Sequence, residues 1–399
     1  MRWTIVCAAV AAGLLLGPVG AGAAAARRPA VIPVVMGGDY QPIAGDFDGN
    51  GQTDILWYSP TAPDVVWLSG GGLPPASHRT VPVVLDGAYT PVVGNFDDRG
   101  GTDILWYRPS PGKSQLWIAT GDANLFSHRT LSIRAGVTPI PATFFQDAPG
   151  DVSPSQRDIY WFSGQPGGMD QIWRGNDDGT FSELPKHPTH VGAIAVAGGF
   201  ERGTGMAGLP DQILFYRPTL GTAEMVSFTD SGSPKPRTLQ IPKNSQPILG
   251  DFWGKRDDGC ESGQGDGYTD IVWYGRGRLP DTGWQFASDG SGHTTTKPYR
   301  QDGDLTPVVT EKGVIDIAED CGTVDIRNSI VWYDPAKGSI GAITGLPKRA
   351  VLVSGDFNGN HSLIAPEEET PHRYGYSYST DLLLYGRGNA PDLTLIDLA

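Results

Sequence analysis

Short apolar runs alternate with turn-forming segments along the whole chain, and one run recurs seven times. The plainest copies are Asp54-Ile-Leu-Trp-Tyr58 and Asp103-Ile-Leu-Trp-Tyr107. The other copies begin at Asp158, Asp211, Asp270, Ser329 and Asp381. Successive copies start 49 to 59 residues apart, as from 54 to 103 and from 270 to 329. A period of this size is typical of one four-stranded blade of a β-propeller.

Each copy is flanked by further apolar runs with the composition of β-strands. In the second copy, Thr90-Pro-Val-Val-Gly94 precedes the run, Gln115-Leu-Trp-Ile118 follows it, and Ser127-His-Arg-Thr-Leu131 comes next. Continuous apolar runs rich in β-branched and aromatic residues, bounded by Gly and Pro, favour strands that are buried on both faces. We therefore predict four strands in a regular copy, with the aromatic side chains in the core of the blade rather than on a ligand-binding surface.

The two ends of the repeat array complement each other. Residues 28–35 resemble the fourth strand at 79–84, whereas the last copy stops after its third strand at 393–398. Pairing of these two segments would leave no open sheet edge there. The sequence therefore predicts an all-β fold, a seven-bladed β-propeller closed by an N-terminal outer strand that pairs with the C-terminal blade, in a single domain of residues 27–399. The sixth copy leaves little room for a fourth strand before Val351.

The first residues predict a secretory signal peptide. Arg2 is followed by an apolar run from Ile5 to Val19 and by small residues from Gly20 to Ala26, which is the layout of a signal peptide with its cleavage site. The alternative is a membrane anchor, for which the run is short. We assign residues 1–26 to the signal peptide and expect a secreted, extracellular, monomeric chain with no membrane span.

The composition restricts the partners. The chain has 44 acidic and 30 basic residues and a formal net charge of −14. A surface of this sign repels phosphate backbones, so we expect no nucleic-acid ligand. With 55 Gly and 33 Pro, the chain also has the turn formers that many short strands require.

One loop has the spacing of oxygen ligands that calcium prefers. Asp46, Asp48, Asn50 and Asp54 stand at positions one, three, five and nine of the loop that leads into the first copy, with Gly at positions four and six. Gln52, at position seven, can offer its backbone carbonyl. The simpler interpretation is a turn rich in Asp, Asn and Gly.

This loop and the repeat around it resemble the FG-GAP/VCBS repeats, a family that includes the integrin α-subunit propellers, here in a secreted bacterial form. The resemblance covers nearly the whole mature chain and is strongest in copies one and two. It implies a structural Ca²⁺ ion bound by the five loop residues named above. Other copies depart from the pattern, because Arg99 replaces the fifth ligand in copy two and insertions split the loops of copies five and seven. The resemblance therefore predicts one good calcium site.

Two cysteines remain after removal of the signal peptide. Cys260 and Cys321 lie in corresponding loops of copies five and six. Equivalent loops of neighbouring blades lie side by side on one face of a propeller, which is close enough for a bridge. In an oxidising compartment we predict a disulfide between them, and two separate thiols are the alternative.

The sequence contains no recognised catalytic motif, and we assign no catalytic residue. It lacks a Gly-x-Ser-x-Gly elbow, a His-Glu-x-x-His helix, a phosphate loop and a Cys-x-x-Cys pair. His187 and His190 have a spacing that is a weak metal signal, and an ordinary exposed loop is the simpler interpretation.

These observations favour a non-catalytic binding or scaffold module for an extracellular glycan or protein. The alternative is an extracellular polysaccharide hydrolase or lyase with a pair of carboxylates near the propeller axis. A structural component of the cell envelope is a third hypothesis. Aromatic residues exposed on one propeller face would favour glycan binding, and no ligand-binding residue is assigned from the sequence.

Overall fold

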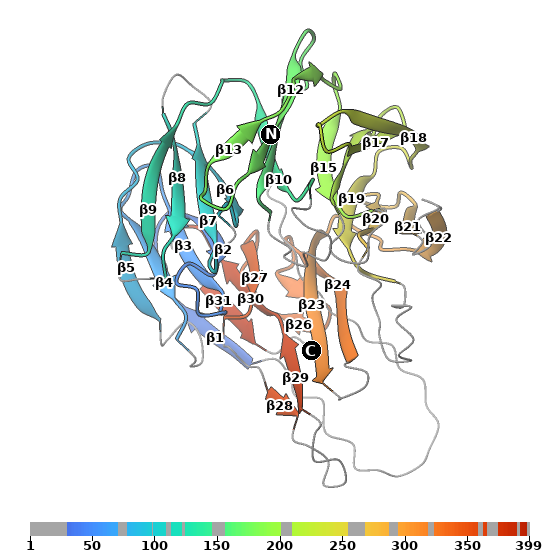
Figure 1. Ribbon diagram of the computed structural model, residues 1–399. Helices are drawn as coiled ribbons and strands as arrows, with labels where there is room; N and C mark the ends of the chain where they lie inside the picture. Colours follow the sequence, from blue (N-terminus) through green and yellow to red (C-terminus); the bar gives the residue numbers. More distant parts are fainter. Residues whose placement is uncertain are drawn as a thin grey trace.

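The fold is a ring of β-sheets. The computed structural model describes residues 30–70, 78–97, 99–108, 113–121, 124–145, 156–200, 210–253, 268–286, 294–317, 323–357, 362–364, 374–388 and 392–396. Within these residues the chain forms 31 strands and no helix. The strands make seven antiparallel sheets, which Figure 1 shows as blades around a ring. The predicted all-β, seven-bladed propeller is confirmed. The predicted signal peptide, residues 1–26, lies outside the described residues.

Four blades consist of four consecutive strands, numbered here from the centre of the ring outward. The first blade holds β2 (Gln41–Gly45), β3 (Asp54–Tyr58), β4 (Asp64–Leu68) and β5 (Arg79–Val83). The second holds β6 (Thr90–Gly94), β7 (Asp103–Tyr107), β8 (Ser114–Ala119) and β9 (Phe126–Leu131). The fourth holds β15 (Ile194–Gly198), β16 (Gln212–Arg217), β17 (Thr222–Phe228) and β18 (Pro234–Gln240). The fifth holds β19 (Gln246–Gly250), β20 (Asp270–Tyr274), β21 (Asp281–Phe286) and β22 (Thr294–Tyr299).

The other three blades vary this plan. The third holds β10 (Thr138–Ala142), β11 (Asp158–Phe162), β12 (Met169–Gly175) and β13 (Phe181–Glu183), and β14 (His187–Pro188) also pairs with β12. The sixth holds β23 (Thr306–Ile317), β24 (Thr323–Asp334), β25 (Ser339–Ile340) and β26 (Ile343–Thr344). The seventh holds β27 (Val351–Gly355), β30 (Asp381–Tyr385), β31 (Asp392–Ile396) and β1 (Ala30–Val34). The innermost strands of the first and last blades, β2 and β27, contact each other.

The sixth blade is completed by very short strands. Its third and fourth strands, β25 and β26, have two residues each, which is all that the short connection from β24 to β27 can supply. The insertion before Ser329 instead lengthens β23 and β24 to twelve residues each. From the seventh blade, β29 (Tyr374–Ser379) pairs with the extension of β23, and β28 (Ser362–Ile364) pairs with β29. The two insertions therefore build one additional piece of sheet together.

The outer strand of the seventh blade comes from the other end of the chain. β1 pairs with β31 in antiparallel register, from Ala30 opposite Ile396 to Val34 opposite Asp392. Just beyond β1, the backbone N–H of Met36 donates to Asp392 Oδ2 at 2.7 Å. Figure 1 shows β1 in blue beside the red strands β31 and β30. The first and last strands of the chain therefore belong to one sheet.

A tyrosine hydroxyl fastens the segment that leads from this sheet into the first blade. Tyr385 is fully buried, and its hydroxyl donates to the carbonyl of Gly38 at 2.5 Å. The same oxygen accepts a hydrogen bond from the backbone N–H of Tyr40 at 3.0 Å. The C-terminal sheet is therefore joined to the first blade by hydrogen bonds as well as by packing.

The core of each blade is aromatic. The second strand is buried along its whole length in five blades, and Trp57, Trp106 and Trp273 have no exposed surface. Four blades repeat the same edge-to-face pair between the second and third strands, with ring centroids 5.0 to 5.3 Å apart: Trp57–Trp67, Trp106–Trp117, Trp161–Trp173 and Trp273–Trp284. Ring quadrupoles favour this arrangement. The prediction that these aromatics form the blade core is confirmed.

The connections between strands divide between the two faces of the ring. Those from the first to the second strand and from the third to the fourth leave one end of each antiparallel blade, and we call this end the loop face. Its described residues are 46–53, 69–70, 78, 95–97, 99–102, 120–121, 124–125, 143–145, 156–157, 176–180, 199–200, 210–211, 229–233, 251–253, 268–269, 341–342, 356–357 and 380.

The opposite end carries the connections from the second to the third strand and from each blade to the next, and we call it the linker face. Its described residues are 35–40, 59–63, 84–89, 108, 113, 132–137, 163–168, 184–193, 218–221, 241–245, 275–280, 300–305, 335–338, 345–350 and 386–388. Backbone hydrogen bonds join these connections in pairs, as between Gly277 and Gly303. No helix in the described residues is long and apolar enough to cross a bilayer.

We expect Tyr385→Phe and Tyr58→Phe to destabilise the protein equally. Tyr58 makes the corresponding contacts inside the chain, donating to Gly87 O at 2.8 Å and accepting from Tyr89 N at 2.7 Å. In the Tyr385→Phe variant, the carbonyl of Gly38 keeps its bond from Gly388 N at 2.7 Å. Loss of either hydroxyl removes two hydrogen bonds to the backbone and leaves one N–H, that of Tyr40 or of Tyr89, without this partner, so the free energy of unfolding should fall by about 1–3 kcal/mol. Chemical denaturation of both variants measures this. A Tyr385→Phe variant as stable as the wild type, beside a destabilised Tyr58→Phe, would contradict the junction between the chain ends.

Candidate functional site: an acidic loop on the first blade

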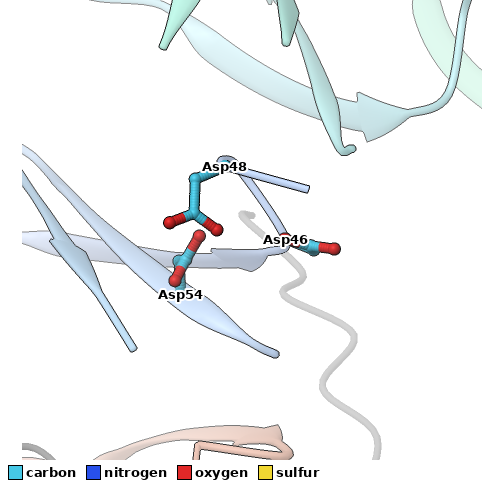
Figure 2. A group of neighbouring side chains, drawn as sticks. All are labelled: Asp46, Asp48 and Asp54. Atoms are coloured by element: carbon cyan, nitrogen blue, oxygen red, sulfur yellow. The ribbon is translucent and has the colours of Figure 1, made fainter. Parts of the chain in front are cut away.

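Three of the five predicted calcium ligands converge on the loop face of the first blade. Asp46, Asp48 and Asp54 each offer a carboxylate oxygen, and these oxygens all lie within 4.8 Å of one another. Figure 2 shows the carboxyl groups of Asp48 and Asp54 turned toward each other, with that of Asp46 projecting to the side. Carboxylate oxygens are the ligands that hard cations such as calcium prefer.

The loop wraps around the carboxylate of Asp46. Its Oδ1 accepts from the backbone N–H of Asn50 at 3.0 Å and its Oδ2 from that of Gly51 at 2.9 Å. Gly49 and Gly51 adopt φ angles of 73° and 84°, in the left-handed region that glycine reaches without strain. The two glycines noted in the sequence therefore make the tight wrap possible.

The other two predicted ligands also take part in the fold of the loop. Asn50 Oδ1 accepts from the backbone N–H of Gln52 at 2.7 Å, and Asn50 Nδ2 donates to the carbonyl of Ser69 at 2.9 Å. The Asn50 amide thus ties the loop to the end of the third strand. Metal ligation by Asn50 and by the Gln52 carbonyl stays a prediction.

Asp54 is a buried carboxylate with two backbone donors. Its Oδ2 accepts from Phe47 N and its Oδ1 from Ser69 N, both at 2.8 Å. Burial raises the pKa of Asp54 to about 7, although these hydrogen bonds oppose the shift, and the charges of Asp48 and Asp46 add to it. Burial and the neighbouring Asp46 also raise the pKa of Asp48. A cation among these groups would stabilise their charged forms.

The same buried aspartate recurs in four other blades, whose loops depart from the calcium pattern. Oδ2 of each accepts from the start of the loop: Asp103 from Phe96 N, Asp158 from Phe144 N, Asp270 from Phe252 N, and Asp381 from Phe357 N. Oδ1 accepts from the end of the third strand in three described cases: Asp103 from Ala119 N, Asp158 from Gly175 N, and Asp270 from Phe286 N. We call this arrangement the aspartate clamp. Position nine of the predicted loop therefore has a structural role that needs no metal.

A second repeated contact joins five of the loops to the next blade, and the sequence analysis did not identify it. Asp46 N donates to Thr102 Oγ1 at 2.9 Å, and Thr102 N donates to Asp46 O at 2.6 Å. The same reciprocal pair is formed between Asp356 and Thr53, Thr143 and Asp211, Gly199 and Thr269, and Asp251 and Asn328. The sequence signal that could have predicted this contact is the Thr that precedes the Asp at the start of several second strands, as in Thr53-Asp54 and Thr102-Asp103. The acidic loop is thus fixed to the second blade.

This contact corrects the alignment of the fourth copy by one residue. Gln212, not Asp211, lies opposite Gly198, as Asp54 lies opposite Gly45 in the first blade. Asp211 occupies the preceding position, and its carboxylate accepts from Thr143 N at 2.8 Å. It therefore belongs to the inter-blade contact rather than to the clamp.

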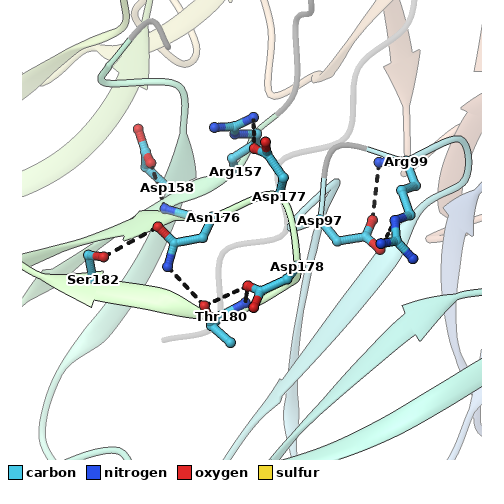
Figure 3. Close-up of polar contacts among 10 residues, drawn as sticks. Asp97, Arg99, Arg157, Asp158, Asn176, Asp177, Asp178, Thr180 and Ser182 are labelled. Carbon is cyan, nitrogen blue, oxygen red and sulfur yellow. Dashed lines mark hydrogen bonds and ion pairs between the residues drawn. The ribbon is translucent and has the colours of Figure 1, made fainter.

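The loop of the second blade contains its own cation. Asp97 is 4% exposed, and its carboxylate accepts from Arg99 N at 3.1 Å and lies 3.6 Å from Arg99 Nε. Figure 3 shows this pair beside the turn that carries Asp177 and Asp178 from the third blade. Arg157 donates to Asp177 across 3.1 Å. The Arg99 guanidinium thus supplies positive charge where the first blade has only carboxylates.

The remaining sequence-based sites have different outcomes. Cys260 and Cys321 lie outside the described residues, so their disulfide stays a prediction. The prediction of an exposed loop is wrong for His190. Its ring stacks on that of Phe215 with the centroids 3.7 Å apart, and its Nε2 lies 3.0 Å from Glu224 Oε1. These contacts pack it against the second and third strands of the fourth blade.

Comparisons with known proteins add little beyond the fold. No family model matches the chain, and no curated protein does. Among solved structures, BBS1N in complex with ARL6DN aligns at 11% identity and a TM-score of 0.45, covering 92% of this chain and 95% of that one. A lectin of Agrocybe aegerita that recognises non-reducing terminal N-acetylglucosamine aligns at 13% identity and 0.46, covering 72% and 79%. A Lactobacillus plantarum protein aligns at 11% identity and 0.37, covering 72% and 80%. These distant similarities assign neither a ligand nor a family.

Proposed function

We propose that this protein is a secreted, non-catalytic binding or scaffold module of the FG-GAP/VCBS type, with a structural calcium ion in its first blade. The observation that carries the calcium proposal is the convergence of three carboxylates within 4.8 Å in one anchored loop. The seven sequence copies and the signal-like residues 1–26 support the family and the extracellular location. The ligand class is an extracellular glycan or a protein.

The surroundings of the loop favour a structural ion over a regulatory one. Asp54 is already held by Phe47 N and Ser69 N, and Asp46 is held by Thr102 of the next blade. An ion bound by Asp46, Asp48 and Asp54 would link groups that the fold positions in advance. Such an ion strengthens the junction of the first and second blades without requiring a change of shape.

The non-catalytic part of the proposal rests on how the buried carboxylates are used. Asp103 and Asp158 are each bonded to two or three backbone N–H groups within their own blade. A general acid or base needs access to a substrate proton, whereas these groups are committed to the fold. The described carboxylates with raised pKa values that are buried, or half-buried in the case of Asp211, all accept hydrogen bonds from backbone N–H groups: Asp54, Asp64, Asp103, Asp158, Asp211 and Asp392.

We expect calcium to raise the melting temperature of the mature protein and a chelator to lower it. At free calcium about 100-fold above the dissociation constant, the gain is about 2.7 kcal/mol. Asp48→Ala should abolish the calcium effect. Asp97→Ala changes the corresponding position of the second-blade loop, where Arg99 provides the charge, and should keep it.

Calorimetric or fluorescence-monitored melting of these three proteins, with calcium and with chelator, checks the expectation. A wild type that melts at the same temperature in both conditions contradicts the calcium site. So does an Asp48→Ala variant that retains the calcium effect.

We expect the immobilised protein to retain an extracellular glycan or protein without altering it. A glycan array and a pull-down from secreted material identify what is retained, and chromatography of the recovered polysaccharide detects shortened products. Retention with unchanged chain length supports the binding role. Release of shorter chains would show a hydrolase or lyase and would overturn the non-catalytic proposal.

A further inference from the structure

The charged residues of the propeller are divided unequally between its two faces. The basic residues of the linker face are Arg108, Lys113, Arg134, Lys186, Lys243, Arg276, Arg278, Arg300, Lys337, Lys348, Arg349 and Arg387. The acidic residues of the same connections are Asp39, Asp86, Asp302 and Asp304. A chain with a formal net charge of −14 therefore carries one face on which basic residues predominate.

The described part of the loop face has the opposite composition. Its acidic residues are Asp46, Asp48, Asp97, Asp177, Asp178, Asp211, Asp230, Asp251 and Asp356. Its basic residues are Arg99 and Arg157. Opposite charges on the two faces give the ring a direction, so that an anionic surface attracts the linker face and repels the loop face.

The basic side chains of the linker face point into solvent. All of them are exposed except Arg108, which is half-buried over the ring of Tyr89. Arg300 pairs with Asp302 at 3.2 Å, and Lys337 pairs with Asp334 at 2.7 Å. The carboxylates at the starts of the third strands lie beneath this surface, buried and bonded to backbone N–H groups: Asp64, Asp170, Asp281 and Asp392.

The exposed aliphatic side chains of the described residues gather on the same face. All the large hydrophobic residues found exposed lie in its connections or at the strand ends beside them: Val35 (86%), Val84 (78%), Leu220 (61%), Val191 (46%), Leu279 (42%), Ile194 (40%) and Met169 (36%). They belong to blades on several sides of the ring, and none is aromatic. Single exposed aliphatic side chains are common on protein surfaces, so what distinguishes this face is that all of those found exposed in the described residues lie on it.

We propose that the linker face binds an anionic lipid surface. Basic residues in the connections of the second to seventh blades contact the anionic headgroups. The tips at Val35 and Val84 of the first blade, and at Leu220 of the fourth, enter the boundary between headgroups and acyl chains. Lys and Arg near an anionic bilayer each contribute to attraction, and apolar side chains add burial.

The arrangement favours lipid over the other anionic partners. A soluble polyanion would use the charges but offers no apolar phase for the aliphatic tips. A neutral glycan is usually held by stacking on exposed aromatics, which the exposed hydrophobics of this face do not include. A protein partner would favour one compact patch, whereas charges and tips here are spread over several blades and suit a planar surface.

This role goes beyond the proposed binding module and does not depend on it. The acidic loop lies on the opposite face, so lipid binding needs no calcium. A protein docked through its linker face would present the loop face, with the acidic loop, away from the membrane. Failure of the vesicle experiment would leave the calcium and ligand experiments unaffected.

The first test is co-sedimentation with vesicles in the presence of a chelator. We expect the mature protein to sediment with vesicles of mixed phosphatidylglycerol and phosphatidylcholine, to stay in solution with phosphatidylcholine alone, and to be released by raised salt. Arg276→Glu/Arg278→Glu should weaken binding more than about tenfold. Arg129→Glu/Lys235→Glu makes the same charge change at exposed positions on the outer strands β9 and β18 and should bind as the wild type does.

The second test separates lipid from a soluble polyanion. Leu220→Asn removes one exposed aliphatic tip and keeps every charge, so it should weaken vesicle binding while leaving any binding to dextran sulfate unchanged. Melting curves of all variants confirm that they are folded. The proposal is overturned by equal binding to neutral and anionic vesicles, by equal loss in both charge variants, or by binding to dextran sulfate without binding to vesicles.

Discussion

A buried carboxylate at the start of the second strand holds five of the seven blades together. In the first blade, Asp54 accepts one hydrogen bond from the start of the loop and one from the end of the third strand, so two separate segments are fixed by one side chain. A buried carboxylate without such donors would be strongly unfavourable. Because both ends of the loop are held in this way, the chain between them can lengthen. This explains why the copies differ most in these loops while the strands keep their register.

Hydrogen bonds that recur from blade to blade also hold the junctions between blades. Reciprocal hydrogen bonds, such as those between Asp46 and Thr102, join neighbouring blades on the loop face. Tyrosine hydroxyls, such as that of Tyr385, join five of the sheets to the following connection on the linker face. Local contacts of two kinds therefore maintain a ring whose innermost strands are otherwise joined by packing alone. These contacts hold the acidic loop in place against the second blade. An ion bound there would therefore strengthen a junction between the first and second blades that is already formed.

The sequence predicted the number of blades and the strands of the regular copies, because buried strands of Ile, Leu, Trp and Tyr leave an unmistakable repeat. It also predicted the acidic loop, although Asp54 recurs in other blades for the clamp rather than for a metal. The two-residue strands β25 and β26 carry no periodic pattern, and the pairing of β29 with β23 joins two insertions that the repeat does not relate. Charge segregation became visible only once each connection was assigned to a face.

Amide hydrogen exchange in the presence of a chelator tests the aspartate clamp most directly. The clamp predicts that the backbone N–H groups of Phe47, Phe96 and Phe252 exchange only through global unfolding, with or without calcium. The N–H groups of the exposed residues Asn50 and Gly51, bonded to the half-buried carboxylate of Asp46, should exchange quickly without calcium. Rapid exchange of Phe96 and Phe252 in the folded protein would contradict the claim that buried aspartates, rather than metal ions, hold the blades together.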